Sequence, residues 1–425
     1  MKIFYLHQHF VAPSGTSGGR SYEFGRRLVA RGHRVTLITG AFEHSGLSTS
    51  GRRSIMNVDG IEVRVLGVPY RQRMSPLRRL QAFAGFMLAA CRESLRIERP
   101  DVVFATSTPL TIAIPGMWAA RWHRCPFVFE VRDLWPAAPI ELGVLRNPLL
   151  IGLARWLERA AYRRATAVVA LSPGMKEGIE ATGVPATKVT VIPNASDVEL
   201  FRVDPEVGRA FRAHHSELGQ RPWVVYAGAF GRVNGVEWGV RLAARVAELD
   251  PAVAFIFCGA GSERAFTEAL ACELGLLGRT VFFHEPIPRV ELPRLLSAAT
   301  ILCSFAQNLP VMRTNSANKF FDAFAAGKPV VINYRGWQAE LLERTGAGLV
   351  LDQDDVPGSA MRLVAALHDP AWLERAAEAS AQLGDTEFNR DRLADQLEEV
   401  LRRAVEGHLP SARVPAAIGP PWQAP

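Results

Sequence analysis

The most informative stretch of the chain reads Asn315-Ser316-Ala317-Asn318-Lys319-Phe320-Phe321-Asp322-Ala323-Phe324-Ala325-Ala326-Gly327-Lys328-Pro329-Val330-Val331. It predicts a helix, a glycine stop and a buried strand. Lys319 and Asp322 stand three residues apart and share a helix face, with Asn315 one turn before Lys319. Such a face suits a diphosphate held by the helix N-terminus and Lys319, and a ribose whose hydroxyls donate to Asp322. An amphipathic helix with a weak surface pair explains the same pattern and stays open.

The stretch from Asn318 to Val331 resembles the nucleotide-sugar motif of family 4 glycosyltransferases, in which an acidic residue stands five places before the Gly of an Ala-Gly-x-Pro-Val-Val run. Asp322 occupies that acidic place. The wider family often has two glutamates separated by seven residues, and the corresponding positions here are Thr314 and Asp322. The first carboxylate is therefore missing and the second is one methylene shorter. The resemblance implies donor binding by Asn315, Lys319 and Asp322.

The length and composition fit a two-domain enzyme. A chain of 425 residues is too long for one comfortable core. Hydrophobic residues make up 48% and charged residues 21%, which excludes global disorder. The net charge of +7 suits an anionic sugar nucleotide or an anionic lipid surface, although many soluble proteins are equally basic.

The cysteine pattern and the N-terminus indicate a cytoplasmic protein. Five scattered cysteines without Cys-x-x-Cys spacing favour reduced thiols over disulfides or a zinc site. The first apolar run, from Met1 to Leu6, is too short for a signal peptide and is expected to be a strand. No apolar stretch approaches the roughly 20 residues of a membrane-spanning helix. We expect a soluble protein, with peripheral attachment to the cytoplasmic face of the membrane left open.

Strand and helix signals alternate along the chain and predict two Rossmann-like halves, each with a mostly parallel sheet covered on both faces. A helix is expected from about Ser21 to Arg31. The expected strands are Lys2 to Leu6, Val35 to Thr39, Glu62 to Leu66, Val102 to Thr106, Phe127 to Val131, Ala167 to Leu171, Trp223 to Gly228, Ala254 to Cys258, Thr280 to Phe283, Ile301 to Ser304, Val330 to Asn333 and Gly348 to Leu351.

The domain boundaries follow from these signals and from a turn, Ile192-Pro193-Asn194-Ala195-Ser196-Asp197, that resembles the interdomain turn of the family. We expect an acceptor-side domain over residues 1–195 and a nucleotide-sugar domain over residues 196–385. The resemblance implies that helical sequence over 386–405 returns across the first domain. The proline-rich residues 406–425 are expected to be a disordered tail.

A glycine loop follows the first predicted strand, Ser17-Gly18-Gly19-Arg20. Successive backbone N–H groups and the start of a helix can face an anion there, and Arg20 adds a guanidinium. The loop is neither a dinucleotide fingerprint nor a Walker loop. Beside the C-terminal motif it resembles the glycine loop of the family, which implies that Gly18, Gly19 and Arg20 contact the donor phosphates. An ordinary turn between strand and helix is the alternative.

Polar residues follow the buried strand Phe127 to Val131, in the order Arg132-Asp133-Leu134-Trp135-Pro136. Parallel sheets place their chemistry beyond the carboxyl ends of strands. Many relatives carry His-Asp here, so Arg132 stands where a neutral imidazole would lie near the sugar. A subgroup that builds cell-surface polysaccharides (O-antigen, exopolysaccharide or capsule) resembles the chain here and at Tyr5 to Phe10. Arg132 and Asp133 are the predicted catalytic residues, with a structural ion pair as the alternative.

Two further turns supply predicted donor contacts. In the wider family an Arg and a Lys hold the phosphates after the strand that ends near Gly228, and Ala229 and Asn234 stand in their places. Arg232, together with Lys319, is expected to meet the phosphate charge instead, and Asn234 to lie beside it. Gly259 and Gly261 form another turn near the diphosphate, for which a plain tight turn is the alternative.

Four arginines, Arg71, Arg73, Arg78 and Arg79, precede a strongly apolar predicted helix. This segment could lie in a membrane interface beside a lipid-linked acceptor, or the helix could be buried with its arginines in solvent. His7 and His9 flank the end of the first strand, where satisfied structural histidines are expected.

Two Rossmann-like halves follow from the strand and helix signals, and the resemblance implies a metal-independent transferase of the GT-B fold, with its two domains facing a central cleft. The resemblance implies transfer of a sugar, with retention, from a nucleoside-diphosphate sugar, UDP-linked by expectation, to a lipid-linked or saccharide acceptor in surface polysaccharide assembly. No cofactor, metal or nucleic-acid partner is expected. Two alternatives stay open, a sugar-nucleotide 2-epimerase and a non-catalytic partner subunit.

Overall fold

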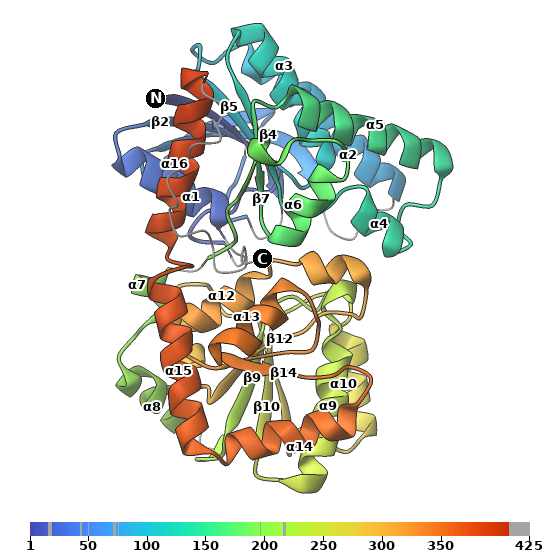
Figure 1. The fold of residues 1–425 in the computed structure, drawn as a ribbon, viewed down its shortest axis with the longest axis vertical. Helices are drawn as coiled ribbons and strands as arrows, with labels where there is room; N and C mark the ends of the chain where they lie inside the picture. The colour runs from blue at the N-terminus through green and yellow to red at the C-terminus, as the bar shows by residue number, and fades with distance from the viewer. Residues whose placement is uncertain are drawn as a thin grey trace. The chain divides into compact units, whose positions relative to one another are not determined.

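The computed structural model describes residues 1–15, 19–42, 45–49, 51–70, 74, 76–195, 197–215 and 218–407. The chain divides into two compact units (Figure 1). Unit 1 comprises residues 1–193 and the described residues from Asp391 onward, and unit 2 comprises Asn194–Arg390. Each unit is an open α/β sheet with helices on both faces, so the predicted fold class of two Rossmann-like domains is confirmed.

Unit 1 is built on a sheet with the strand order β3-β4-β2-β1-β5-β6-β7-β8 among its described residues. Every pair is parallel except β3 with β4. The central strands are fully buried apolar runs, as two-sided coverage requires. The strands are β1 (Lys2–Leu6), β2 (Arg34–Phe42), β3 (Arg53–Val58), β4 (Ile61–Tyr70), β5 (Val102–Thr106), β6 (Phe127–Val131), β7 (Ala167–Ala170) and β8 (Val189–Val191).

The helices of unit 1 cover this sheet on both faces. They are α1 (Arg20–Ala30), α2 (Pro76–Ser94), α3 (Ala113–His123), α4 (Ala137–Glu141), α5 (Pro148–Arg164), α6 (Pro173–Glu180) and α16 (Arg390–Glu406), with short 3-10 turns at Leu110–Ile112 and Ala186–Lys188. α2, α3 and α5 lie side by side on one face. α16 packs against α1, where Arg27 Nε donates to the carboxylate of Asp391 at 2.5 Å.

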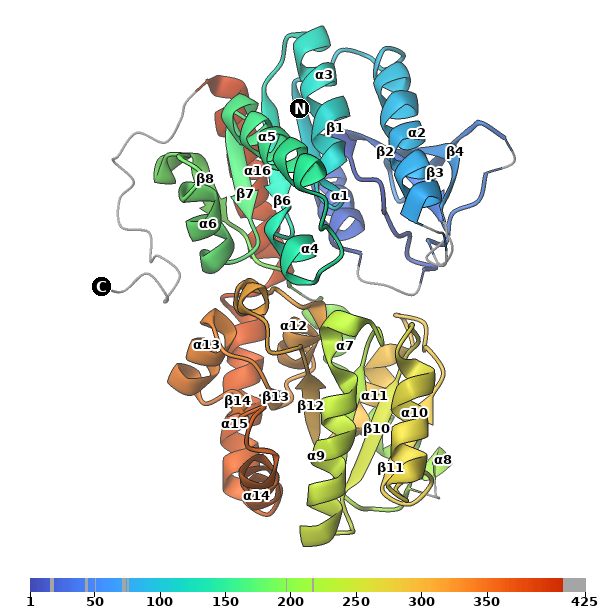
Figure 2. The same ribbon diagram turned by 90° about the vertical axis from the view of Figure 1, so that its right-hand side faces the viewer.

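Unit 2 is built on a parallel sheet with the order β11-β10-β9-β12-β13-β14. α9 packs between α10 and α14 on this sheet (Figure 2). The strands are β9 (Trp223–Ala227), β10 (Ala254–Cys258), β11 (Val281–His284), β12 (Ile301–Ser304), β13 (Val330–Ile332) and β14 (Gly348–Val350). The helices are α7 (Val198–Phe201), α8 (Pro205–His214), α9 (Val236–Leu249), α10 (Arg264–Glu273), α11 (Leu292–Ala298), α12 (Asn318–Ala325), α13 (Trp337–Thr345), α14 (Val356–Leu367) and α15 (Pro370–Asp385), and 3-10 turns span η4 (Arg232–Asn234) and η5 (Pro310–Thr314).

Three features bear on the expectations for membrane contact and thiols. Across the described ranges, no helix is both long enough and apolar enough to cross a bilayer. α2 buries Ala82, Phe86 and Ala90 in the core of unit 1, as its buried-helix alternative required. Of the four arginines for which membrane contact and solvent exposure were both open, Arg71 and Arg73 fall outside the described residues. All five cysteines are free thiols.

Candidate functional site

Lys319 and Asn234, both predicted donor contacts, meet in unit 2. Lys319 lies in the first turn of α12, and its Nζ donates to Asn234 Oδ1 at 3.0 Å. The same Nζ lies 5.0 Å from the centroid of the Tyr226 ring. A Cβ at Gly228 would lie 2.7 Å from Lys319 Cε, so glycine is the residue that leaves room for this side chain. The ammonium group therefore sits at the carboxyl end of β9, where parallel sheets bind ligands.

The Lys319 ammonium group is a poorly hydrated cation. Burial lowers the pKa of Lys319 to about 8, and the nearby Asp322 carboxylate opposes this shift. A cation that is already stripped of much of its water gains more from pairing with an anion than an exposed one does. A phosphate placed on Lys319 would pair with the ammonium group and raise the pKa of the amine again.

Asp322 has a partner that the sequence did not suggest. Its buried carboxylate receives two hydrogen bonds from Arg289, from Nη2 to Oδ1 at 3.1 Å and from Nη1 to Oδ2 at 3.4 Å. The guanidinium of Arg289 also lies 4.8 Å from the centroid of the Phe201 ring. A carboxylate has about four lone-pair sites, and Arg289 uses two of them, which leaves acceptor capacity for ribose hydroxyls. Arg289 would then hold the Asp322 carboxylate in position.

The other predicted donor contacts of this region are Arg232 and Asn315. Each lies a few residues before a residue of the Lys319–Asn234 contact in the sequence. Arg232 is exposed on η4, two residues before Asn234, and it makes no hydrogen bond or ion pair with any described residue. The backbone carbonyl of Asn315 accepts from Trp337 Nε1 at 2.8 Å, which fixes the chain just before α12. The half-buried side chain of Asn315 precedes the start of α12 by three residues.

Gly259 and Gly261 are required by the packing of two loops. Gly259 has φ +146°, and a Cβ there would lie 1.9 Å from the carbonyl oxygen of Gly228. Gly261 has φ +157°, and its Cβ would lie 2.3 Å from the carbonyl oxygen of Phe230. The two backbones are joined by hydrogen bonds, including Phe230 N–H to the Ala260 carbonyl at 2.8 Å. The tight-turn alternative thus accounts for both glycines, and they shape the loop that holds Asn234.

In unit 1 the predicted catalytic Arg132 lies beside a histidine. Arg132 Nη1 and His7 Nε2 are 3.2 Å apart, and the Arg132 backbone N–H donates to Ser107 Oγ at 2.9 Å. Burial and the Arg132 charge hold the pKa of His7 well below its usual range. The same two causes lower the pKa of His9 to about 4. A neutral imidazole, that of His7 after β1, is therefore present at the carboxyl ends of β1 and β6. Asp133, the second predicted catalytic residue, is exposed to solvent.

His7 is not the fully satisfied structural histidine that the sequence led us to expect. Its Nε2 accepts from Arg132, which leaves the proton of the neutral ring on Nδ1. Nδ1 is buried and finds no hydrogen-bond partner among the described residues. A buried donor without a partner costs free energy, so its retention favours a role that a bound group would complete.

Arg20 has a structural role in place of the predicted phosphate contact. It is buried, and its Nε and Nη2 donate to Glu130 Oε1 at 3.0 and 2.8 Å. Nη1 donates to the carbonyl oxygen of Pro193 at 2.6 Å, and Nη2 also donates to that of Ile192 at 2.8 Å. With these donors used inside the protein, Arg20 ties the end of unit 1 to β6. Gly19 is the N-cap residue of α1, and Gly18 lies outside the described residues.

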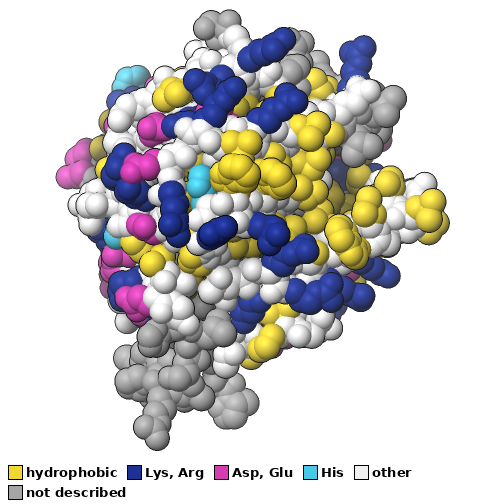
Figure 3. Space-filling view, turned by 90° about the horizontal axis from the view of Figure 1, so that it is seen from above, with side chains coloured by type: hydrophobic (Ala, Val, Ile, Leu, Met, Phe, Trp, Pro, Cys, Tyr) yellow, Lys and Arg dark blue, Asp and Glu magenta, His cyan; other side chains and the backbone are white. Residues whose placement is uncertain are grey.

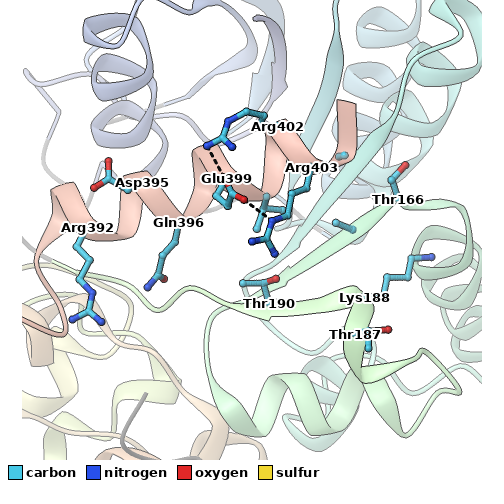
Figure 4. Close-up of a pocket in the computed structure, with 13 residues that line it drawn as sticks. Thr166, Thr187, Lys188, Thr190, Arg392, Asp395, Gln396, Glu399, Arg402 and Arg403 are labelled. Carbon is cyan, nitrogen blue, oxygen red and sulfur yellow. Dashed lines mark hydrogen bonds and ion pairs between the residues drawn. The ribbon is translucent and has the colours of Figure 1, made fainter. Parts of the chain in front are cut away.

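A cavity of about 490 Å³ in unit 1 lies away from these groups, between α16 and the β7–β8 edge (Figure 4). Thr166 and Lys188 come just before β7 and β8, so the cavity opens at the amino ends of the strands. Arg402 and Arg403 both pair with Glu399 at 2.5 Å (Figure 4). Chemistry in parallel sheets lies at the carboxyl ends, so this cavity is not the donor site. In the described part of the chain, no cluster of three or more His, Cys, Asp or Glu could hold a metal ion.

Comparison with known families agrees with this geometry. A model described as a glycosyl transferase 4-like domain matches residues 15–195, and one described as glycosyl transferases group 1 matches residues 209–383. Together they account for most of the chain, and each falls on one of the two Rossmann-like sheets. The chain belongs to the glycosyltransferase family. Residues Asn234, Lys319 and Asp322 thus lie in the part of this glycosyltransferase that the group 1 model describes.

The relatives of this glycosyltransferase are distant. Alpha-D-kanosaminyltransferase of Streptomyces kanamyceticus is 26% identical over 255 residues, which cover 59% of this chain and 64% of that relative. The alpha-maltose-1-phosphate synthase of Mycolicibacterium smegmatis is 25% identical over 397 residues, which cover 88% of this chain and 98% of the synthase. The glycosyltransferase thus spans just under two thirds of the first relative and nearly all of the second.

Solved structures share the fold of this glycosyltransferase. The crystal structure of Anabaena HepE in complex with UDP and glucose superposes with a TM-score of 0.67 at 19% identity, covering 95% of this chain and 99% of HepE. At this identity the similarity shows the fold alone.

Three residues of the candidate site carry no clear signal of their role in the sequence. Arg289 follows β11 in a loop without a motif, Glu130 is one more member of a buried apolar strand, and His7 was assigned a structural role. A charge inside an otherwise apolar strand is the one signal that could have drawn attention to Glu130, because an unpaired buried carboxylate is not tolerated. The partner of Asp322 lies 33 positions away in the sequence, where spacing carries no information.

Proposed function

We propose that this glycosyltransferase moves a hexosyl or N-acetylhexosaminyl group from a UDP-sugar to a lipid-linked or saccharide acceptor in surface polysaccharide biosynthesis, with retention. One observation carries the donor half of the proposal. The half-buried Lys319 ammonium group lies over Tyr226 and on Asn234, at the carboxyl end of a parallel strand. The complex of HepE with UDP and glucose supports UDP as the nucleotide to test first.

In the proposed mechanism, the diphosphate of the donor binds Lys319 and the exposed Arg232, and the ribose hydroxyls donate to Asp322. The bond between the anomeric carbon and the phosphate oxygen breaks, and the acceptor oxygen bonds to that carbon. The acceptor proton passes to the departing phosphate oxygen, so no separate base is required. Lys319 and Arg232 stabilise the charge that develops on the leaving diphosphate. We assign contacts with the transferred sugar and the acceptor to Arg132 and the neutral His7. The exposed Asp133 remains a catalytic candidate.

The donor site is tested by calorimetric titration with UDP, GDP and dTDP. We expect UDP to bind most tightly and Lys319→Gln to weaken it by about 1.5–3 kcal/mol, the value of a hydrogen bond to a charged group. Lys176→Gln on α6 is the matched control and should leave the affinity unchanged. If no nucleotide binds the wild-type protein, the proposal fails and a non-catalytic partner becomes the better description.

The ribose role of Asp322 needs a double variant, because Asp322→Ala also leaves Arg289 without its partner. We expect UDP affinity to fall in Asp322→Ala and to stay low in Asp322→Ala/Arg289→Leu. Recovery in the double variant would show that Asp322 acts only by neutralising Arg289. Incubation with UDP-sugars and analysis of the products then separates transfer, which releases UDP, from epimerisation, which returns an isomerised UDP-sugar.

A further inference from the structure

The first half of α5 leaves an apolar stripe uncovered. Leu149, Leu153 and Trp156 stand at i, i+4 and i+7, so they share one face of the helix. They are 82%, 59% and 57% exposed. The next member of the same stripe, Ala160, is only 5% exposed because the second half of α5 packs on the core of unit 1. The sequence therefore continues a core-type stripe beyond the point where the core covers it.

The neighbouring helix α3 adds two indole rings to this surface. Trp118 and Trp122 are 46% and 58% exposed, and their ring centroids lie 6.5 Å apart in a stacked arrangement. α3 packs beside α5, and Arg164 Nη1 of α5 reaches Met117 Sδ of α3 at 3.9 Å. We call the exposed side chains of these two helices the α3–α5 face. Large aromatic and aliphatic groups gathered on one surface mark an interaction site.

The charges of the α3–α5 face are almost all positive. Its two helices carry five exposed arginines and a single acidic residue, Glu158. Burial raises the pKa of Glu158 to about 7, so even this carboxyl is partly neutral near pH 7. Figure 3 shows hydrophobic side chains gathered on this side of the molecule and bordered by Lys and Arg, with most of the visible Asp and Glu on the other side. The arginines are Arg121, Arg155, Arg159, Arg163 and Arg164.

We propose that the α3–α5 face binds the surface of an anionic lipid bilayer. Tryptophan and leucine side chains enter the interfacial region, while arginines beside them pair with anionic head groups. A second copy of the chain fits less well, because a two-fold contact would bring two sets of the same arginines together. The inference rests on the proposed function in one respect: a lipid-linked acceptor would be presented at the membrane to which this face binds.

The test is co-sedimentation with vesicles. We expect the wild-type protein to bind vesicles of phosphatidylcholine with phosphatidylglycerol and to bind pure phosphatidylcholine at least tenfold more weakly. Trp122→Ser/Trp156→Ser should reduce binding to the anionic vesicles at least tenfold. The matched control is Leu249→Ser/Phe266→Ser, which removes two exposed apolar side chains from α9 and α10 of unit 2 and should change nothing.

A charge-reversal pair separates the electrostatic contribution. Arg155→Glu/Arg159→Glu should abolish the preference for anionic vesicles, whereas Arg245→Glu on unit 2 should preserve it. Equal vesicle binding by the α3–α5 variants and the wild type would overturn the proposal. So would a wild-type dimer that Trp122→Ser/Trp156→Ser converts to a monomer, since the face would then serve self-association.

The outcomes also distinguish this inference from the proposed function. Loss of vesicle binding with unchanged UDP affinity is expected for the α3–α5 variants, because none of their residues belongs to the donor site. A wild-type protein that binds UDP but no anionic vesicles would refute the membrane surface alone. One that binds vesicles but no nucleotide would refute the donor site and leave the α3–α5 face standing.

Discussion

The fully buried pair of Arg20 and Glu130 joins the start of α1 to β6, an interior strand of the sheet of unit 1. Glu130 Oε1 receives two hydrogen bonds from Arg20, and Oε2 receives one from the Thr106 hydroxyl. Glu130→Ala would leave a buried guanidinium without its carboxylate, and breaking such a pair typically costs about 3–5 kcal/mol. Urea unfolding should show a loss of that size. Glu62→Ala, at an exposed partner of Arg64, should cost at most about 1 kcal/mol. Equal losses would mean that the pair is not a structural anchor.

The titration of Lys319 makes a prediction about pH. Its pKa is lowered to about 8, so UDP affinity should fall as the pH rises from 7.5 to 9.5, at up to about tenfold per pH unit. Lys319→Gln should flatten this profile. Arg232→Gln should weaken binding but keep the profile, because an arginine stays charged throughout. A flat wild-type profile would remove Lys319 from the donor site.

The lowered pKa of Lys319 affects the free energy of unfolding in the direction opposite to its effect on UDP affinity. Between about pH 8, the pKa of Lys319 in the folded protein, and pH 10.5, the ordinary pKa of a lysine, the unfolded chain binds the additional proton. The contribution of Lys319 to the free energy of unfolding therefore rises with pH in that window and is smallest below pH 8. Affinity and stability should thus change in opposite directions on raising the pH, which separates loss of the ammonium charge from general alkaline unfolding.

At the scale of elements, the strands were predictable where they were buried on both faces. Val102–Thr106, Phe127–Val131 and Ile301–Ser304 were predicted to the residue, because a short apolar run between turn signals allows little choice of boundary. β3 (Arg53–Val58) was not predicted. It is an edge strand of alternating burial that pairs antiparallel with β4. Its apolar residues are interrupted by polar ones, so it shows no continuous apolar run. β8, with three residues, gave no pattern at all.

The candidate site was predictable only where it lies on one element. Helical spacing brought Lys319 and Asp322 to one face without knowledge of the fold. The contacts of Lys319 with Asn234 and of Asp322 with Arg289 join different loops and depend on tertiary packing. Arg20 illustrates the opposite case: its position after a glycine loop suggested an anion contact, and neither its partner Glu130 in β6 nor its contacts with the chain after β8 could be read from the sequence.

The contact of the two glycine loops makes the element-scale prediction. Gly259→Ala would place a Cβ against the Gly228 carbonyl oxygen and force the β9 loop to move, which would displace Lys319 and Asn234 as well. We expect lower stability and at least tenfold weaker UDP binding. Gly278→Ala is the control: its φ is +73° and no atom lies within 4 Å of the added Cβ. It should cost only the left-handed strain of about 1–2 kcal/mol and spare UDP affinity. Normal UDP binding by Gly259→Ala would show that the loop contact does not position the donor groups.

At the scale of the whole molecule, the two proposals assign different ligands to different units. UDP is assigned to the carboxyl end of β9 and the first turns of α12 in unit 2, and the bilayer to the α3–α5 face of unit 1. Hydrogen exchange followed by mass spectrometry can check both in the same intact protein. Local protection reports where a ligand suppresses opening of the backbone, so each ligand should leave its own footprint.

We expect saturating UDP to slow exchange in residues 228–235 and 318–325, which contain Asn234, Lys319 and Asp322, and to leave residues 113–123 and 148–164 unchanged. Anionic vesicles without nucleotide should give the reverse pattern, because the apolar stripe of α5 and the indoles of α3 would leave water. Lys319→Gln should erase the first footprint and keep the second, and Trp122→Ser/Trp156→Ser should do the opposite. A UDP footprint confined to unit 1 would contradict the donor assignment, since the groups chosen to hold the diphosphate all lie in unit 2.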